Sequence, residues 1–588
     1  MGDHSSVFAR AGFLKGFLFA AVFVAMVVSF VPVRYEANDD FGLIARFSRE
    51  SGFKPDPLQP HVSWSLGAVL CPLYRWHPKV PWYGLFIYTA AFWGMSLILS
   101  VLFRSTRGAS MWLALPLLGI LFFHVFSFGS FTSASLLLEC GVFLSVMEWV
   151  VRGECPAKHP RFYAGTLALG FLAAFVLRWM MVLFASAFGA PVLLFVRKRQ
   201  LGKAIPLLMV LGLAMAGDRA LFHLMISDEH KAFLEYNALR ARFNDTVRGD
   251  DHGPLTRRAL QKAGWSLEDY VFYKSWVLYD NREFNTETLR TFLRENDPKK
   301  EESVFQLGLK GLRRQFRIGN HYALALVFAT VSILVYRFDD WWRYARRMQL
   351  RILLTLAVIA FGILYVMCFR FVPRVFVPLS AYFFGTCFMF SHLKSDPQPE
   401  SRNRPVFKKV LLLCAILFCL LTWGQAYAQG RKVARILKQS EAEKAYIQHG
   451  LSWVRNREAT TDPLLVLMDP VGGLGAEYVH PLKEYSDFTD LRVFPGGWGA
   501  HSPRFYSILR DMGLPDGRAF LEWMIDNPRA LLVLRTKGRM YTLRWESLWE
   551  SYYARRIAPG KSVRLVPVYD FRNGNGAGLV LFRMRSAG

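Results

Sequence analysis

The chain has 588 residues, of which 53% are hydrophobic and 15% aromatic, and it carries a formal net charge of +27. This composition excludes an ordinary soluble domain, and repeated apolar runs close to twenty residues long predict a polytopic membrane protein. The basic residues gather in short connections between these runs, as the positive-inside rule requires, so the charge does not indicate nucleic-acid binding. The seven cysteines show neither a disulfide framework nor a CxxC metal site.

The first apolar run extends from Gly12 to Val33 and is preceded by Arg10. A basic flank before an apolar run is typical of a secretory signal. This run is too long for the core of a signal peptide, however, and no clear small-x-small cleavage site follows it. We therefore predict an uncleaved signal anchor with a cytoplasmic N-terminus.

One alternating topology places all the short loops that are dense in arginine and lysine on the same side of the membrane. The segment 163–196 is either one long tilted helix or a hairpin of two short helices. Basic flanks at both of its ends favour the hairpin, with Arg178 and Trp179 at the outer turn. The predicted transmembrane helices, about eleven in number, cover 12–33, 82–103, 111–127, 132–151, 163–178, 181–197, 204–225, 320–337, 351–369, 375–393 and 408–427.

Three longer segments lie on the outer side in this topology. The first, 34–81, contains an amphipathic stretch from Phe41 to Phe53 and a run from His61 to Tyr74 that predicts a helix at the membrane interface. The second, 226–319, is polar and mostly helical in pattern.

The third outer segment, 428–588, predicts a separate soluble α/β domain, because short apolar runs typical of strands occur among helical patterns. The predicted strands are Leu464–Met468, Leu531–Leu534 and Leu579–Phe582. The expected fold is thus a polytopic α-helical membrane domain over 1–427 followed by an extracytoplasmic α/β domain.

Two adjacent carboxylates, Asp39 and Asp40, follow the first apolar run within Asn38-Asp-Asp-Phe-Gly42. Ionised groups beside a hydrophobic helix must be hydrated or given something to bind. At the level of a lipid headgroup, such a pair can deprotonate an acceptor hydroxyl or hold a divalent cation, Mg or Mn, against a diphosphate. The alternative is a hydrated turn, for which Asn-Asp-Asp is a natural composition.

The order of elements in the first part of the chain resembles the GT-C superfamily of membrane glycosyltransferases. It comprises a first span, an outer acidic pair, an amphipathic segment, an interfacial helix and a second span entered through Pro78, Pro81 and Trp82-Tyr83. The resemblance implies a catalytic acidic motif at Asp39 and Asp40. It also implies a sugar donor linked to a polyprenyl phosphate, and transfer with inversion.

Such a donor requires cations near the outer interface. Arg370 and Arg374 lie in a short basic, aromatic and proline-containing loop, and GT-C proteins often carry a comparable element in a late outer loop. Arginine suits the task because its planar fork can give two hydrogen bonds to a phosphate. Arg178 at the predicted hairpin turn is a third candidate. The alternative for all three is that they reach anionic headgroups from the ends of helices.

Other polar and aromatic residues have two interpretations each. Glu139, an acid within an apolar run, either orients Arg178 and lines the site or makes a structural contact between helices. His61 and Trp64, like Trp265 and Trp276, either shape a sugar pocket or serve as interfacial anchors and core residues.

Three further motifs remain in the outer segments. Asp250-Asp251-His252 forms a rival acidic motif in a loop flanked by glycine. Gly472-Gly473-x-Gly475 lacks the full dinucleotide-binding pattern. The loop Gly496-Gly497-Trp498 is a possible contact point of the C-terminal domain.

The sequence therefore predicts a glycosyltransferase of a bacterial inner membrane that moves a sugar from a polyprenyl-phosphate donor to an envelope glycan or lipid. Asp39 or Asp40 would be the general base, membrane lipids would surround the helices, and the C-terminal domain would be periplasmic. One alternative is a non-catalytic transporter or assembly factor for envelope polysaccharide. Another is a polysaccharide ligase or phosphoglycerol transferase, although His480 and His501 show no matching metal-ligand spacing.

Overall fold

The protein is described by a computed structural model. The described residues are 3–36, 38–48, 55–59, 61–105, 109–157, 159–189, 198–246, 254–296, parts of 352–363, 372–391, parts of 424–457, 464–468, 480–482, 491–494, 497–535, 545–572 and 578–587. The predicted spans at 320–337 and nearly all of 408–427 lie outside these residues, as does part of the span at 351–369.

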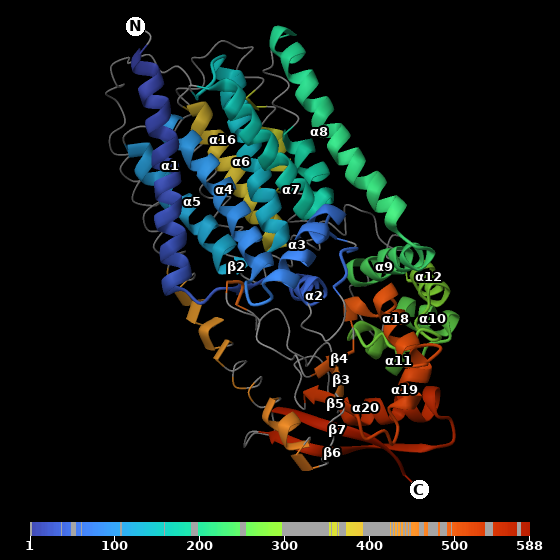
Figure 1. The fold of residues 1–588 in the computed structure, drawn as a ribbon. Helices are drawn as coiled ribbons and strands as arrows, with labels where there is room; N and C mark the ends of the chain where they lie inside the picture. Colours follow the sequence, from blue (N-terminus) through green and yellow to red (C-terminus); the bar gives the residue numbers. More distant parts are fainter. Residues whose placement is uncertain are drawn as a thin grey trace.

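Long apolar helices form a bundle in the upper half of Figure 1. Four helices of the described residues are long and apolar enough to cross a membrane, and a fifth span is added if the bent pair Met209–Met225 and Asp228–Asn244 is one span. α6 lies at the centre and contacts α4, α7 and α16. The bundle consists of α1 (Asp3–Phe30), α4 (Trp82–Ser105), α5 (Ala109–Ser127), α6 (Phe131–Arg152), α7 (Pro160–Gly189), α8 (Lys198–Met225) and α16 (Pro373–Ser391).

α7 reverses direction at Arg178, whose backbone is not helical (φ −159°, ψ 84°). Gly170, before this corner, packs against Val142 of α6, and Gly189, after it, packs against Phe143 at nearly the same level of α6. A straight helix would separate these two glycines by about 28 Å. Over Pro160–Gly189 the chain therefore runs as two antiparallel helical halves, in agreement with the predicted hairpin, and residues 190–196 of the predicted segment lie outside the described residues.

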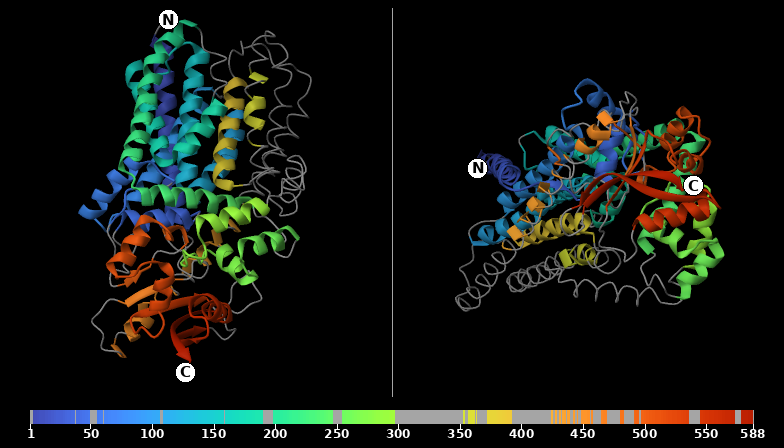
Figure 2. Two further views of the ribbon diagram at one scale, coloured as in Figure 1. Left: turned by 90° about the vertical axis from the view of Figure 1, so that its right-hand side faces the viewer. Right: turned by 90° about the horizontal axis from the view of Figure 1, so that it is seen from below.

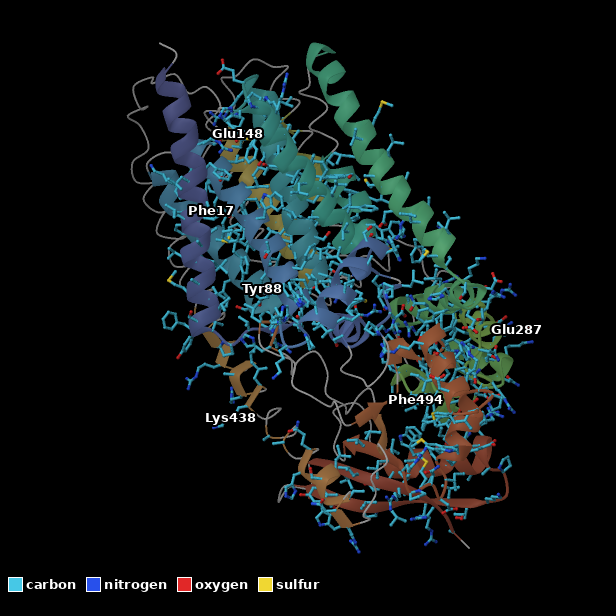
Figure 3. All side chains as sticks on the ribbon, in the orientation of Figure 1. Phe17, Tyr88, Glu148, Glu287, Lys438 and Phe494 are labelled. Atoms are coloured by element: carbon cyan, nitrogen blue, oxygen red, sulfur yellow. The ribbon has the colours of Figure 1, made fainter. Side chains whose placement is uncertain are left out.

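The end of the bundle that carries the corner is drawn downward in Figure 1 and is called the lower end. Figure 3 shows Tyr88 toward this end and Glu148 toward the opposite, upper end. At the upper end, Glu148 is fully buried. It accepts hydrogen bonds from Arg104 and forms an ion pair with Arg152. These contacts join α4 and α6 far from the elements described next.

Short elements cover the lower end. β1 (Arg34–Tyr35) pairs in parallel with β2 (Phe128–Gly129), which ties the chain after α1 to the end of α5. α2 (Asn38–Phe47) and α3 (Trp64–Trp76) follow, and α3 is the predicted interfacial helix. α3 begins at Ser63, whose hydroxyl caps it by accepting from the Ser65 N–H.

A second unit, called the lower unit, lies beneath the bundle (Figures 1 and 2). Its helical part comprises α9 (Asp228–Thr246), α10 (Pro254–Ala263), α11 (Leu267–Lys274) and α12 (Thr286–Glu295). α11 begins with a capping box, in which Ser266 and Asp269 each accept from the other's backbone N–H.

The lower unit also contains a five-stranded mixed sheet in the order β4-β3-β5-β7-β6, in which the β3–β4 and β3–β5 pairs are parallel and β7 pairs antiparallel with β5 and β6. The three predicted strands fall within β3, β5 and β7. The elements are β3 (Leu464–Met468), β4 (Leu491–Val493), η4 (Gly497–Gly499), α18 (Pro503–Asp511), α19 (Gly517–Trp523), β5 (Ala530–Arg535), α20 (Trp545–Tyr552), η5 (Tyr553–Ile557), β6 (Ser562–Arg572) and β7 (Gly578–Ala587).

The second outer segment and the C-terminal segment share one hydrophobic core. Phe272 of α11 stacks on Tyr552 of α20, with ring centroids 4.5 Å apart. Buried Asp280 accepts hydrogen bonds from Arg518 at 2.9 Å and from the Tyr552 hydroxyl at 3.0 Å. Because these contacts link the two segments, the lower unit is built from 226–319 as well as from 428–588.

The opposite face of the sheet has a smaller core of its own. Leu451 and Val454, both in helical conformation, pack there with Val466 of β3 and Leu531 of β5. This contact lies within the predicted helical pattern Arg431–Val454. The sheet is thus covered on both faces.

Candidate functional site

Asp40 is fully buried at the lower end of the bundle. Its Oδ1 accepts hydrogen bonds from the Tyr83 hydroxyl at 2.9 Å and from the Phe131 backbone N–H at 3.1 Å. The second donor is an unsatisfied N–H of the first turn of α6, where a carboxylate is favoured. Its Oδ2 is buried and has no hydrogen-bond partner. This arrangement excludes the hydrated turn that the sequence Asn-Asp-Asp allowed.

Asp39 faces a different partner from its neighbour, because adjacent residues of a helix point in different directions. It forms an ion pair with Arg374 at 3.6 Å, and both side chains are largely buried. The acidic motif and Arg374, which were selected separately from the sequence, therefore lie in contact. The other arginine of that loop, Arg370, lies outside the described residues.

Glu36 is a third acid of this cluster, which the sequence analysis did not select. It accepts a hydrogen bond from the Arg374 backbone N–H, and its Oε2 is buried without a partner. The positive charge of Arg34, on β1, favours the ionised form of Glu36. The Arg34 guanidinium also lies over the Phe128 ring at 5.1 Å. Glu36 is two residues before Asn38, so proximity in sequence was the only signal that could have identified it.

Burial raises the pKa values of two of these acids. The pKa of Asp40 rises to about 7, because the loss of hydration outweighs the hydrogen bonds from Phe131 and Tyr83. The pKa of Glu36 also rises to about 7, because burial outweighs the attraction of Arg374 and Arg34. Near neutral pH, each acid can therefore take up or release a proton.

Arginines from distant parts of the chain act on His61, which lies two residues before the α3 cap Ser63. Burial lowers the pKa of His61 well below its usual range, and four guanidinium groups lower it further. No carboxylate is among the causes. The four are Arg178, Arg240, Arg46 and Arg374. The surroundings of His61 are therefore strongly positive.

Arg178 owes its position to the corner of α7. Its Nη1 donates to the Thr132 hydroxyl at 2.8 Å, and its guanidinium lies over the Phe131 ring at 4.7 Å. Phe131 also supplies a backbone N–H to Asp40. The first turn of α6 thus holds both the acid and one arginine.

Arg46 and Arg240 were not selected from the sequence. Arg46 is six residues after Asp40 on α2 and donates to Gln59 Oε1 at 2.6 Å. Arg240 lies on α9 of the lower unit, almost fully buried, and donates to the Gly497 carbonyl at 3.0 Å. Burial lowers the pKa values of both guanidinium groups, and the pKa of Arg240 falls to about 10. Only tertiary structure brings them to His61.

The lower unit touches the bundle close to Asp40. A Cβ atom added to Gly84 would lie 1.7 Å from the Pro481 carbonyl oxygen, so the turn His480–Leu482 lies directly against α4. Leu482 packs on the core of the bundle. Gly84 is next to Tyr83, the hydrogen-bond partner of Asp40. The lower unit also touches α2 through η4, which contains Gly497 and Trp498.

Several predicted residues lie apart from this cluster or have structural contacts. Glu139 is buried between helices and accepts a hydrogen bond from Ser186 at 3.4 Å. Trp64 begins α3, and Trp265 belongs to the core of the lower unit. The motifs Asp250-Asp251-His252 and Gly472-Gly473-x-Gly475 lie outside the described residues.

The two histidines of the third segment also have local partners. His501 stacks on Tyr236 and hydrogen-bonds the Leu278 carbonyl at 2.9 Å. His480 Nδ1 accepts from the Leu482 backbone N–H at 3.1 Å.

A divalent cation would need more ligands than this cluster offers. Among the described residues, no three His, Cys, Asp or Glu side chains lie together in a way that could hold a metal ion. Asp39 is already paired with Arg374, and one oxygen of Asp40 accepts two hydrogen bonds. The residues present do not fit a metal site, and no chemical step below depends on one.

No protein-family model, curated protein or solved structure matches this chain. The molecule is thus characterised by its own geometry. It is a largely helical protein with several apolar helices that could span a membrane, and a buried carboxyl group lies among arginines at one end of the bundle.

Proposed function

We propose that the protein is a membrane glycosyltransferase of the GT-C type, which transfers a sugar from a polyprenyl-phosphate donor to a hydroxyl acceptor. The observation that carries this proposal is the meeting of a buried carboxyl, which has one oxygen without a partner, with two arginines. Phe131 donates its N–H to Asp40 and lies under the Arg178 guanidinium, and the adjacent Asp39 pairs with Arg374. This transfer needs a carboxylate that can take up a proton and a positively charged environment for the leaving phosphate.

Asp40 would act as the general base. Its ionised Oδ2 takes the proton of the acceptor hydroxyl while the acceptor oxygen bonds to the anomeric carbon of the sugar. A pKa of about 7 suits this task, because the group is substantially ionised at neutral pH and still accepts a proton readily. Tyr83 and the Phe131 N–H orient the carboxyl through its other oxygen.

The arginines would bind the phosphate of the donor. The bond between the anomeric carbon and the phosphate oxygen breaks as the acceptor bond forms, and its electron pair leaves with the lipid phosphate. Arg374 and Arg178 are the two nearest to the acid motif, through the contacts to Asp39 and Phe131. Guanidinium groups stabilise the negative charge that develops on the leaving phosphate. Asp39 would hold Arg374 in position.

The proposed setting is a bacterial inner membrane with the lower end of the bundle on the periplasmic side. This orientation places the arginine-rich loops of the sequence in the cytoplasm. It also places the lower unit where an envelope glycan or lipid would serve as acceptor.

The test is sugar transfer by the purified protein in nanodiscs from a panel of polyprenyl-phosphate sugars, with donor binding measured in parallel. We expect Asp40→Asn to lower turnover by about 10²- to 10⁴-fold while donor binding is retained. Asp39→Asn should mainly weaken donor binding, because it releases Arg374. Wild-type turnover by Asp40→Asn with a confirmed donor would refute the assignment of the base.

A further inference from the structure

A second cluster of hydrogen-bond donors, formed by Arg219 and Trp179, lies at the α7 corner. The guanidinium of Arg219, on α8, lies over the Trp179 ring at 4.8 Å and over the Phe222 ring at the same distance. The Nε and Nη2 atoms of Arg219 are buried and have no hydrogen-bond acceptor. The indole Nε1 of Trp179 is in the same situation. Three hydrogen-bond donors are thus left without acceptors around one pair of side chains.

The neighbouring acid does not satisfy these donors. Asp218 Oδ2 is 3.6 Å from Arg219 Nη2, which is an ion pair but not a hydrogen bond. The other oxygen, Oδ1, accepts from the hydroxyls of Ser63 and Ser65. Because these contacts fix Asp218 to the start of α3, its other oxygen stays 3.6 Å from Arg219 Nη2, and Arg219 Nε is left without an acceptor.

The surface beside these donors is apolar and exposed. Met180 and Leu183 follow Trp179 on α7, with 49% and 57% of their side-chain surface accessible, and Leu221 on α8 is 46% exposed. In a chain with spanning helices, such side chains contact lipid chains. Arginine and tryptophan at the end of a span are placed at headgroup level. The cluster therefore combines hydrogen-bond donors for a headgroup with a surface for its chains.

We propose that Arg219 and Trp179 bind the phosphate group of a membrane lipid, whose hydrocarbon chains lie along the exposed faces of α7 and α8. A phosphate supplies several acceptor oxygens and can receive two hydrogen bonds from a guanidinium and one from an indole. Buried donors without acceptors are costly, so this ligand resolves an otherwise unfavourable arrangement.

This site is separate from the proposed donor site. Arg178 points toward Thr132 and Phe131 of α6, whereas the next residue, Trp179, contacts Arg219 of α8. A bound lipid on the α8 side would thus stabilise the corner that positions Arg178. The inference concerns binding alone and does not rest on the transferase proposal.

The test uses the delipidated full-length protein in detergent and native mass spectrometry. The probes are phosphatidylglycerol, undecaprenyl phosphate, diacylglycerol and inorganic phosphate. The variants are Arg219→Gln and Trp179→Phe, which keeps the ring and removes only the N–H. The control is Arg161→Gln, which changes an exposed arginine at the upper end of α7.

We expect both phosphate-bearing lipids to bind at least tenfold more tightly than diacylglycerol. Arg219→Gln should remove this preference, Trp179→Phe should weaken it severalfold, and Arg161→Gln should leave it unchanged. Tighter binding of phosphatidylglycerol would identify a phospholipid as the source of the phosphate, and tighter binding of undecaprenyl phosphate would identify a polyprenyl lipid. Either order supports the site.

Three results would overturn the proposal. The first is equal binding of diacylglycerol and phosphatidylglycerol. The second is an unchanged phosphate preference in Arg219→Gln, provided that circular dichroism shows the same helix content as wild type. The third is displacement of the lipids by inorganic phosphate at equal concentration, because the site would then recognise an anion without its chains.

Discussion

Replacing Asp40 with asparagine is expected to stabilise the fold at alkaline pH and to change it little at acid pH. In the wild type, the folded-state pKa of Asp40 is raised from 3.8 to about 7 by burial. As the pH rises, the carboxyl ionises in the unfolded chain before it ionises in the folded one. The free energy of unfolding of the wild type therefore falls with rising pH. Asparagine is uncharged at every pH and still offers an acceptor oxygen to Tyr83 and to the Phe131 N–H.

The size of the effect follows from the pKa difference. One pKa unit corresponds to about 1.4 kcal/mol, so the full penalty on the wild type is about 4 kcal/mol. The penalty is absent below the unfolded-state pKa, grows to about 2 kcal/mol near pH 5.5 and is complete above about pH 7. The advantage of Asp40→Asn should follow the same curve.

The assay is thermal or denaturant unfolding in detergent at a series of pH values for both proteins. At pH 6, infrared difference spectroscopy between the two proteins should show a smaller carbonyl band of protonated carboxylic acids in the variant, reduced by the contribution of one group because Glu36 keeps its proton. A difference in stability that stays constant from pH 4 to pH 9 would refute the reasoning. So would a variant that is less stable than wild type at pH 9.

An acid with the opposite shift provides the control. Asp516 caps α19 by accepting from the Ala519 N–H at 2.8 Å, and its pKa is lowered by that bond and by Arg282 despite some burial. A lowered pKa means that its stabilisation is present at neutral pH and is lost as the pH falls through the folded-state value. Asp516→Ala should therefore destabilise the protein by about 1 kcal/mol at neutral pH, with a smaller effect in acid.

Three other changes test the contacts that hold the molecule together. Gly84→Ala should push the Pro481 turn away from α4 at a cost of about 1–3 kcal/mol, and limited proteolysis of the lower unit should become faster. The control is Gly165→Ala, where a Cβ meets nothing within 4 Å. Equal proteolysis rates in both variants would contradict the contact. Glu148→Gln should destabilise the upper end by about 3–5 kcal/mol, because it leaves buried Arg104 without its counter-charge; Glu154→Gln, an exposed neighbour, should unfold as wild type does. Asp280→Asn should separate the two segments of the lower unit, measured as faster hydrogen exchange in α19 and α20, and unchanged exchange there would show that Arg518 and Tyr552 do not depend on this acid.

Much of the fold could be predicted from charge and periodicity. The reversal at Arg178 followed from basic flanks at both ends of 163–196, because each flank favours the same side of a membrane. The run His61–Tyr74 predicted an interfacial helix, and the structure places α3 at Trp64–Trp76 with Ser63 as its cap. Such local signals act over a few residues, which is why they were sufficient for these elements.

The shared core of the lower unit could not be predicted in this way. Its contacts, such as Phe272 with Tyr552, join residues almost three hundred positions apart. Each segment shows a plausible pattern of its own, so nothing local indicates that the two pack together. The same limit applies to Arg46 and Arg240, which resemble ordinary charged residues on helices until the fold brings them to His61.

The local sequence identifies the acidic pair Asp39 and Asp40, but it does not distinguish the roles of the two residues. Asp39 and Asp40 are chemically identical, and the sequence could not assign a role to either. Consecutive positions in the first turn of α2 point in different directions, so Asp40 enters the bundle and Asp39 meets Arg374. Burial then raises the pKa of Asp40 to about 7. In the proposed transfer, Asp40 takes the proton and Asp39 holds the phosphate-binding Arg374, because helix geometry separates the side chains of two adjacent residues.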